Sequence, residues 1–172
     1  MVALNSKFDI LRGWPNSSAV QEDFVIGGTS AHGHRQGEWV SLASTTDGSM
    51  KTDDSLPSSA PDKVCYLIIE GLDDHSSKFA NRVTCLLGGG YMVRIPEVAP
   101  DAFAGGTEYR CFGAVNDAQG NPVNQTAAEF TVGSFAAVAA GKLVPHGQRD
   151  GVEVGQVVAV NVNNGTIDLL VF

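Results

Sequence analysis

Short apolar runs alternate with polar turn residues along most of the chain. Runs of about four to eight residues, bounded by Gly, Pro, Asn and Asp, are typical of β-strands rather than helices. The expected strands are residues 38–43, 49–52, 64–70, 82–87, 91–95, 129–132, 134–139, 142–144, 154–162 and 166–172. No segment has the period of a convincing amphipathic helix. The pattern therefore predicts an all-β fold with a small β-barrel or β-sandwich core.

Turn residues connect these strands at recognisable places. Residues 163–165 are Asn-Asn-Gly, and an Asn-Gly pair between apolar runs is a strong hairpin signal. Residues 47–48 are Asp-Gly and predict a second turn, between the first two strands. Residues 56–62 contain two prolines, which lack the N–H groups of a β-ladder, so we expect a loop there.

The chain divides into four parts by composition. Its first part is polar and irregular, with a short strand near residues 23–27, and predicts an extended arm that covers its own core or reaches a neighbour. The third part is rich in Gly and Pro and predicts a loop-rich crossover with one strand around residues 108–112. The four parts are an N-terminal arm (1–35), a first β unit (36–95), the crossover (96–128) and a second β unit that completes the core (129–172).

The two β units resemble each other. Residues 37–50 and 133–143 both open with glycine, carry an aromatic residue two positions later and end with a glycine-led hairpin return. An apolar strand and then a strand rich in Thr and Leu follow each segment. We interpret this as an internal duplication of a small β unit. The alternative is that hairpins with similar turn chemistry look alike without a shared origin.

Length and charge restrict the class of protein. The 172 residues suffice for one compact domain or for two small units that share a core. The net charge of −8 argues against binding to nucleic acid or to an anionic membrane, because both need clustered Lys and Arg. No apolar run is longer than the six residues of 135–140, which is much shorter than the ~20 residues of a membrane helix. The N-terminal residues show no secretory signal, so we expect folding in a reducing cytoplasm.

The polar residues predict no catalytic site. His32 and His34 would share one face of a strand and could hold a metal, but they lie in a Gly/Ser-rich stretch without a clear third ligand. Residues 73–76 are Asp-Asp-His-Ser, and adjacent residues cannot form the line of a catalytic triad. No zinc, phosphate-binding or hydrolase motif occurs in the sequence. We therefore predict that the protein is not an enzyme and binds no cofactor or metal.

The cysteines and aromatic residues have ordinary structural explanations. No C-x-x-C motif occurs, and we interpret the three cysteines as small buried thiols: Cys65, Cys85 and Cys111. Trp14, Trp39 and Tyr91 are candidates for a platform on which a sugar ring stacks. Packing of these side chains in the core is the alternative.

Several segments together resemble small tailed-bacteriophage virion proteins of the capsid cement (decoration) type. The likeness is carried by residues 37–42, 47–48, 67–71, 73–78, 83–91, 141–145 and 164–172. It covers most of residues 36–95 and 129–172, but neither the arm nor the crossover. Its motifs are strand and turn patterns rather than catalytic signatures. The family has small β-barrel or β-sandwich cores, binds the outside of an assembled shell and has no enzymatic activity.

This resemblance implies a structural role in the virion. The protein would bind the major capsid protein at the capsid surface after synthesis in the host cytoplasm, and would form a homo-oligomer, with a trimer as the first expectation. Four apolar residues of the arm are the candidate partner anchors, since their segment is too short for a core of its own: Phe8, Ile10, Leu11 and Trp14. The alternative for this arm is that it packs on its own core.

Two other classes of function remain open at this stage. One is a receptor- or carbohydrate-binding β-sandwich module of a phage fibre or spike, which requires Trp39 and Tyr91 to be exposed on one face. The other is a small hydrolase, which requires two or three members of one set to converge in a pocket: His32, His34, His75, Cys111 and the nearby acids.

Overall fold

The computed structural model describes residues 9–12, 20–25, 36–40, 66–70, 82–87, 90–99, 109–147 and 152–172. Within these ranges the regular structure is β, apart from one turn of 3-10 helix, η3 (Ala127–Glu129). The predicted all-β fold is confirmed. The expected segments at residues 41–65 and 71–81, including the turn at 47–48 and the loop at 56–62, lie outside the described residues.

The larger sheet has six strands, and every neighbouring pair is antiparallel. Its order is β1 (Asp9–Arg12), β6 (Met92–Pro96), β14 (Thr166–Val171), β13 (Val152–Asn161), β11 (Phe135–Ala139) and β12 (Lys142–Pro145). The predicted hairpin at residues 163–165 joins β13 to β14, and Gly165 adopts a positive φ of 60° there. Ala140 and Gly141 join β11 to β12 with φ values of 51° and 74°, as a tight hairpin turn requires.

The larger sheet keeps two edge strands, β1 and β12, so its ladders do not close a barrel. A short segment of chain nevertheless continues the β12 edge. The Leu143 N–H donates to the Cys111 carbonyl and the Gly113 N–H donates to the Leu143 carbonyl, both at 2.8 Å. The Cys111 N–H in turn donates to the carbonyl of Glu97, just beyond β6. Next to this link, β7 (Val98–Ala99) pairs with β8 (Tyr109–Arg110).

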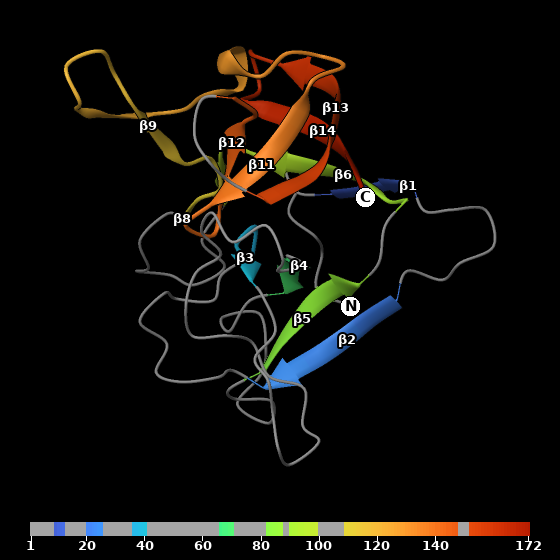
Figure 1. The fold of residues 1–172 in the computed structure, drawn as a ribbon. Helices are drawn as coiled ribbons and strands as arrows, with labels where there is room; N and C mark the ends of the chain where they lie inside the picture. Colours follow the sequence, from blue (N-terminus) through green and yellow to red (C-terminus); the bar gives the residue numbers. More distant parts are fainter. Residues whose placement is uncertain are drawn as a thin grey trace.

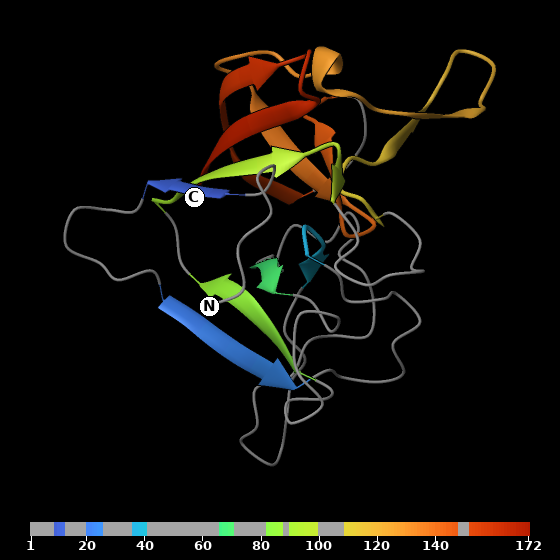
Figure 2. The ribbon, with the colours of Figure 1, turned by 180° about the vertical axis from the view of Figure 1, so that it is seen from behind.

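A second sheet of four strands lies beside the first (Figures 1 and 2). Its order is β2 (Val20–Val25), β5 (Arg82–Leu87), β4 (Tyr66–Glu70) and β3 (Trp39–Val40). The Trp39 N–H donates to the carbonyl of Gly141 in the β11–β12 turn, at 2.9 Å. This hydrogen bond connects the backbones of the two sheets.

One hydrophobic cluster serves both sheets. Trp39, Leu67 and Leu86 of the four-stranded sheet belong to the same buried cluster as Ile167 and Leu169 of the six-stranded sheet. All five side chains are at most 2% exposed. The predicted β units therefore share a single core rather than forming separate barrels.

Most of the predicted strands are present, and two predictions need correction. The expected strand at residues 129–132 is wrong, because Thr126 and Glu129 cap the 3-10 turn η3 there. The crossover at residues 96–128 contains more strand than the single one expected, namely β7, β8 and the hairpin strands β9 (Ala114–Asn116) and β10 (Pro122–Asn124). Within the first 35 residues, β1 and β2 each add an edge strand to a sheet of this chain.

The predicted likeness between the two units extends to their backbone hydrogen bonds. The Gly37 N–H donates to the carbonyl of Ile68, whose N–H donates to Glu38. The Gly133 N–H likewise donates to the carbonyl of Val157, whose N–H donates to Ser134. Strand order agrees as well, since β3–β4–β5 are neighbours in one sheet and β11–β13–β14 in the other.

Gly37 and Gly133 allow a matched stability test. Their φ values are 89° and 87°, a region that costs an L-residue about 1–2 kcal/mol. A Cβ at Gly37 would also overlap the Sγ of Cys111, whereas a Cβ at Gly133 meets nothing within 4 Å. We expect Gly133→Ala to lower the free energy of unfolding by about 1–2 kcal/mol, and Gly37→Ala to cost about 1–3 kcal/mol more. Equal losses for the two variants in urea unfolding would contradict the close packing at Gly37.

Candidate functional site

The residues predicted to carry chemistry do not form a site in the part of the chain that the structure describes. No group of three or more His, Cys, Asp and Glu side chains there lies close enough to hold a metal ion. His32, His34 and residues 73–76 lie outside the described ranges. The fourth histidine, His146, is about half exposed and lies 3.0 Å from Glu153. Among the described residues, no helix is long and apolar enough to cross a membrane.

The predicted sugar-stacking platform is wrong for two of its three members. Trp39 is fully buried and Tyr91 is only 3% exposed, so neither ring is accessible to a sugar. Both rings pack in the main hydrophobic cluster instead. Trp14 lies outside the described residues. The fibre or spike alternative therefore loses the exposed aromatic face on which it depended.

The candidate anchors of the N-terminal arm are only partly described. Ile10 and Leu11 lie in β1, whose backbone pairs with β6, Ile10 being opposite Val93. Phe8 and Trp14 lie outside the described residues. Partner binding by these four residues therefore stays a prediction.

Cys85 and Cys111 are buried thiols, as predicted, and Cys65 lies outside the described residues. Burial raises the pKa of the Cys111 thiol to about 12, so this thiol stays protonated at neutral pH. A protonated, inaccessible thiol is a poor nucleophile. Cys111 therefore acts as a packing residue, placed against the backbone of Gly37.

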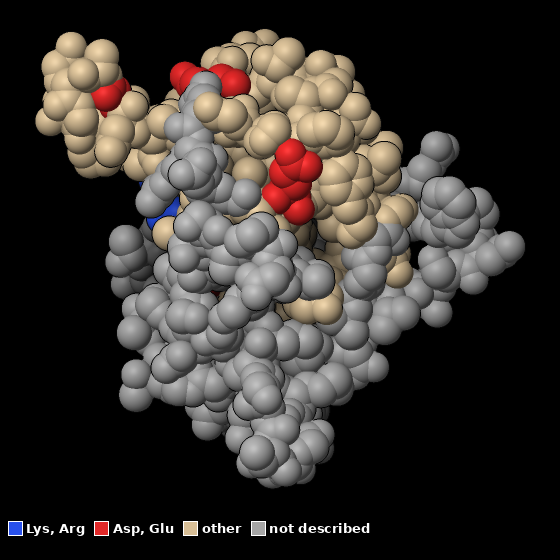
Figure 3. All heavy atoms as spheres, in the orientation of Figure 1, with Lys and Arg blue, Asp and Glu red and all other residues tan. Residues whose placement is uncertain are grey.

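The most prominent feature of the surface is the β9–β10 hairpin, which projects away from both sheets (Figure 1). Figure 3 shows it as a separate lobe beside the body. Every residue from 116 to 124 is exposed, including Val123 at 48%. A two-stranded hairpin without a supporting layer is marginally stable in water, so the order of this one must come from its two ends.

The tip of the hairpin is organised around the side chain of Asp117. Its Oδ1 accepts hydrogen bonds from the backbone N–H groups of Gln119 and Asn121, at 2.9 and 2.8 Å. The Gly120 N–H donates to the Asp117 carbonyl, with Gly120 at a φ of 85°. These hydrogen bonds, that from the Asn121 backbone above all, lower the pKa of the Asp117 carboxyl. The tip therefore holds one shape without contact to the body.

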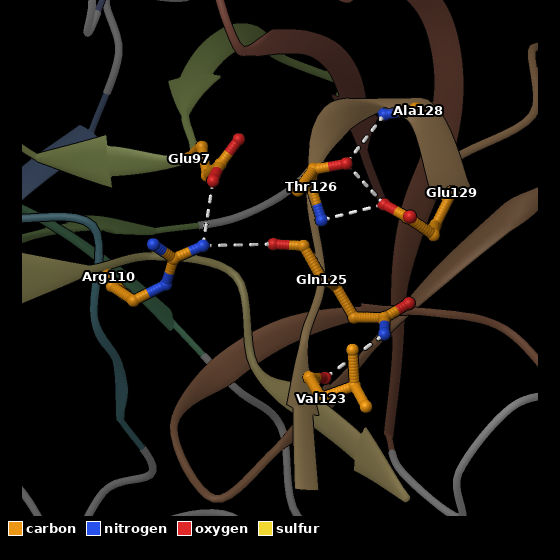
Figure 4. Close-up of polar contacts among 7 residues, drawn as sticks. All are labelled: Glu97, Arg110, Val123, Gln125, Thr126, Ala128 and Glu129. Atoms are coloured by element: carbon orange, nitrogen blue, oxygen red, sulfur yellow. Dashed lines mark hydrogen bonds and ion pairs between the residues drawn. The ribbon is translucent and has the colours of Figure 1, made fainter. Parts of the chain in front are cut away.

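The base of the hairpin is held by Arg110. Its Nη2 donates to Glu97 Oε1 at 2.7 Å and to the Gln125 carbonyl at 3.2 Å (Figure 4). The Gln125 N–H donates to the carbonyl of Gly113 on the opposite side of the base. Val115 packs on the small cluster formed by β11 and β12. The hairpin is therefore attached to the body through polar and apolar contacts together.

The chain leaving the hairpin is fixed by a capping box. The Thr126 N–H donates to Glu129 Oε2 at 2.7 Å, and the Thr126 hydroxyl accepts from the Ala128 N–H (Figure 4). Phe130 follows and is buried, its ring 4.8 Å from that of Phe112. Phe112 lies just before β9, so the aromatic pair joins the chain entering the hairpin to the chain leaving it.

A second surface feature is a group of exposed rings, which we call the Phe135 cluster: Phe135, His146 and Phe172. Phe135 is 40% exposed and Phe172 57% exposed. The ring of Phe135 lies 5.6 Å from that of Phe172 and 6.3 Å from that of His146, both edge to face. Large exposed apolar side chains in mutual contact are typical of an interaction surface.

Sequence reasoning missed both surface features. The hairpin had a usable signal, because Asp117, Gly120 and Pro122 are turn residues flanked by Val115 and Val123. The Phe135 cluster had none, since Phe135 lies in β11, His146 just after β12 and Phe172 just after β14. Comparison of the chain with protein-family models, with curated proteins and with solved structures finds no match.

The capping box predicts a pH-dependent contribution to stability. The hydrogen bond from Thr126 lowers the pKa of Glu129 below its usual 4.5. The capping box therefore stabilises the fold fully at pH values above 4.5, and this contribution disappears as the pH falls through the lowered pKa of Glu129. We expect Glu129→Gln to lower the free energy of unfolding by about 0.5 kcal/mol at pH 7, and by less as the pH falls through the lowered pKa of Glu129.

Thr126→Ala serves as the companion variant, because it also removes the acceptor of the Ala128 N–H. It should cost about 1 kcal/mol at pH 7 and retain part of that loss at pH 3. Urea unfolding of both variants and the wild type at the two pH values gives the comparison. A loss for Glu129→Gln that is the same at both pH values would show that the Glu129 charge is not involved.

Proposed function

We propose that this chain is a non-enzymatic virion structural protein that binds the outer surface of an assembled phage capsid and stabilises it. The observation that carries the proposal is the β9–β10 hairpin, which is exposed over residues 116–124 and yet held firmly at its base. An ordered hairpin whose residues 116–124 are all exposed is suited to contact with another molecule.

The hairpin supports docking because it is ordered in advance. Asp117 organises the tip, and Arg110 with the capping box holds the two ends. A preorganised element loses little conformational entropy on binding, so more of its contact energy appears as affinity. This property suits a protein that must hold a shell together.

The chemistry of the hairpin indicates what kind of contact it would make. Asp117 is the single charged residue between residues 114 and 125, and its carboxylate is engaged by the tip itself. Five of the other eleven residues carry amide side chains, and Val123 is the large exposed apolar group. Binding would therefore rest on hydrogen bonds and apolar contact, and would depend little on salt.

The sequence supports the same role from a different direction. Its strand and turn patterns resemble those of capsid cement proteins, and its net charge of −8 keeps an outer surface soluble and repels packaged DNA. The partners that we propose are the major capsid protein and further copies of this chain, in the virion.

The proposal is tested by co-sedimentation with phage heads that lack this protein. We expect saturable binding that raises the temperature at which the heads break up. Val123→Asp should weaken binding about tenfold, because it places a charge on the contact surface. Val162→Asp is the matched control, since Val162 is also an exposed valine, at 60%, and lies in the β13–β14 turn. Equal binding by the two variants would remove the hairpin from the contact, and failure of the wild type to bind any head would refute the proposal.

The arm anchors require a separate test. Deleting residues 1–35 would remove the edge strands β1 and β2 from both sheets, so truncation would confuse folding with binding. Phe8→Ser and Trp14→Ser leave these strands in place. We expect each variant to release from heads faster than the wild type, with an unchanged midpoint of urea unfolding. Unchanged release would show that these two side chains do not contact the capsid.

A further inference from the structure

The two β units differ in the burial of the aromatic side chain at equivalent positions. Trp39 and Phe135 each lie two residues after a glycine with a φ near 88°, which is 89° at Gly37 and 87° at Gly133. The backbone hydrogen bonds of the two glycines to the neighbouring strand are the same. Trp39 is fully buried, whereas Phe135 is 40% exposed. The two positions therefore differ in what covers them.

Within one chain, the Trp39 position is where the first unit contacts the second. The Trp39 N–H donates to the Gly141 carbonyl in the β11–β12 turn of the second unit. The Trp39 ring joins the hydrophobic cluster that contains Leu143 and Ile167 of that unit. The aromatic position of the first unit is therefore an interface between units.

We propose that the Phe135 cluster is the corresponding interface between two copies of this chain. The similarity of the two units indicates a second copy of this chain as the partner. In one chain the second β unit covers Trp39, and a second copy offers the same unit to cover Phe135. Such a contact joins different surfaces of the two copies, and contacts of this kind close into rings when the rotation allows it. This inference goes beyond capsid binding, since it concerns contact between copies in the absence of a capsid.

The chemistry of the cluster suits this occupant. Aromatic side chains bury about 150–250 Å² each and dominate interface energetics. The His146 ring of the cluster lies 3.0 Å from Glu153, and these two side chains are 48% and 45% exposed. Copies that each carry a net charge of −8 repel one another, so their association must come from apolar contact. Salt screens the repulsion, and we expect association to strengthen as the salt concentration rises.

Sedimentation velocity of the full chain, without heads, tests the inference. We expect the wild type to be an oligomer at micromolar concentration, with tighter association at high salt than at low salt. Phe135→Ser and Phe172→Ser should each weaken self-association at least about tenfold. Phe172 is 57% exposed, so its substitution leaves the core intact even where Phe135→Ser disturbs β11. Far-UV circular dichroism and urea unfolding check that each variant is folded.

Val162→Ser is the matched control for this surface. Val162 and Phe172 are similarly exposed, at 60% and 57%. Val162 follows the last residue of β13, whereas Phe172 bonds to Val154 near the first residue of that strand. It should leave self-association unchanged. A wild type that stays monomeric at high concentration and high salt overturns the inference, as does an oligomer that both phenylalanine variants leave intact. A cluster needed for binding to heads but not for self-association would be a capsid contact, and would also overturn it.

Discussion

The segment 111–113 is the constraint on which the rest of the structure depends. Its backbone pairs with Leu143 of β12 on one side and with Glu97, beyond β6, on the other. Both surfaces of this segment are closely packed: a Cβ at Gly113 would meet Val144, and Cys111 fills the space beside Gly37. Residues 111–113 therefore contact both the edge of the larger sheet and Gly37, which lies two residues before Trp39 of the smaller sheet.

This junction also explains why a hairpin can project from the body and stay ordered. β9 begins directly after Gly113, and the chain returns through Gln125 to the same place, where Gln125 bonds back to Gly113. Phe112 and Phe130 then pack against each other inside the core. The two ends of the hairpin are held by this closely packed segment, so its exposed strands need no supporting layer.

The sequence predicted those strands whose apolar runs are long, and failed where local polar contacts or distant packing decide. Residues 82–87 form a strand as predicted, and Cys85 and Leu86 within it are buried. Residues 129–132 do not form a strand, because Glu129 bonds with Thr126 in a capping box and belongs to a 3-10 turn. The apolar pattern does not reveal this turn. Trp39 is buried in a cluster with residues that are distant in sequence, such as Leu143 and Ile167. The exposure of Phe135 cannot be predicted from the sequence either, because the residue pattern around Phe135 matches that around Trp39.

The pairing of β1 and β2 has a consequence for the order of folding. The strands from β11 to β14 are joined by short connections and pair with close neighbours in sequence. β1 pairs with β6, and β2 with β5, across most of the first hundred residues. Closing such long loops costs entropy before any contact is gained, so distant pairings form slowly. We therefore expect the C-terminal strands to pair early in folding, and β1 and β2 to join their sheets late, although they precede those strands in the chain.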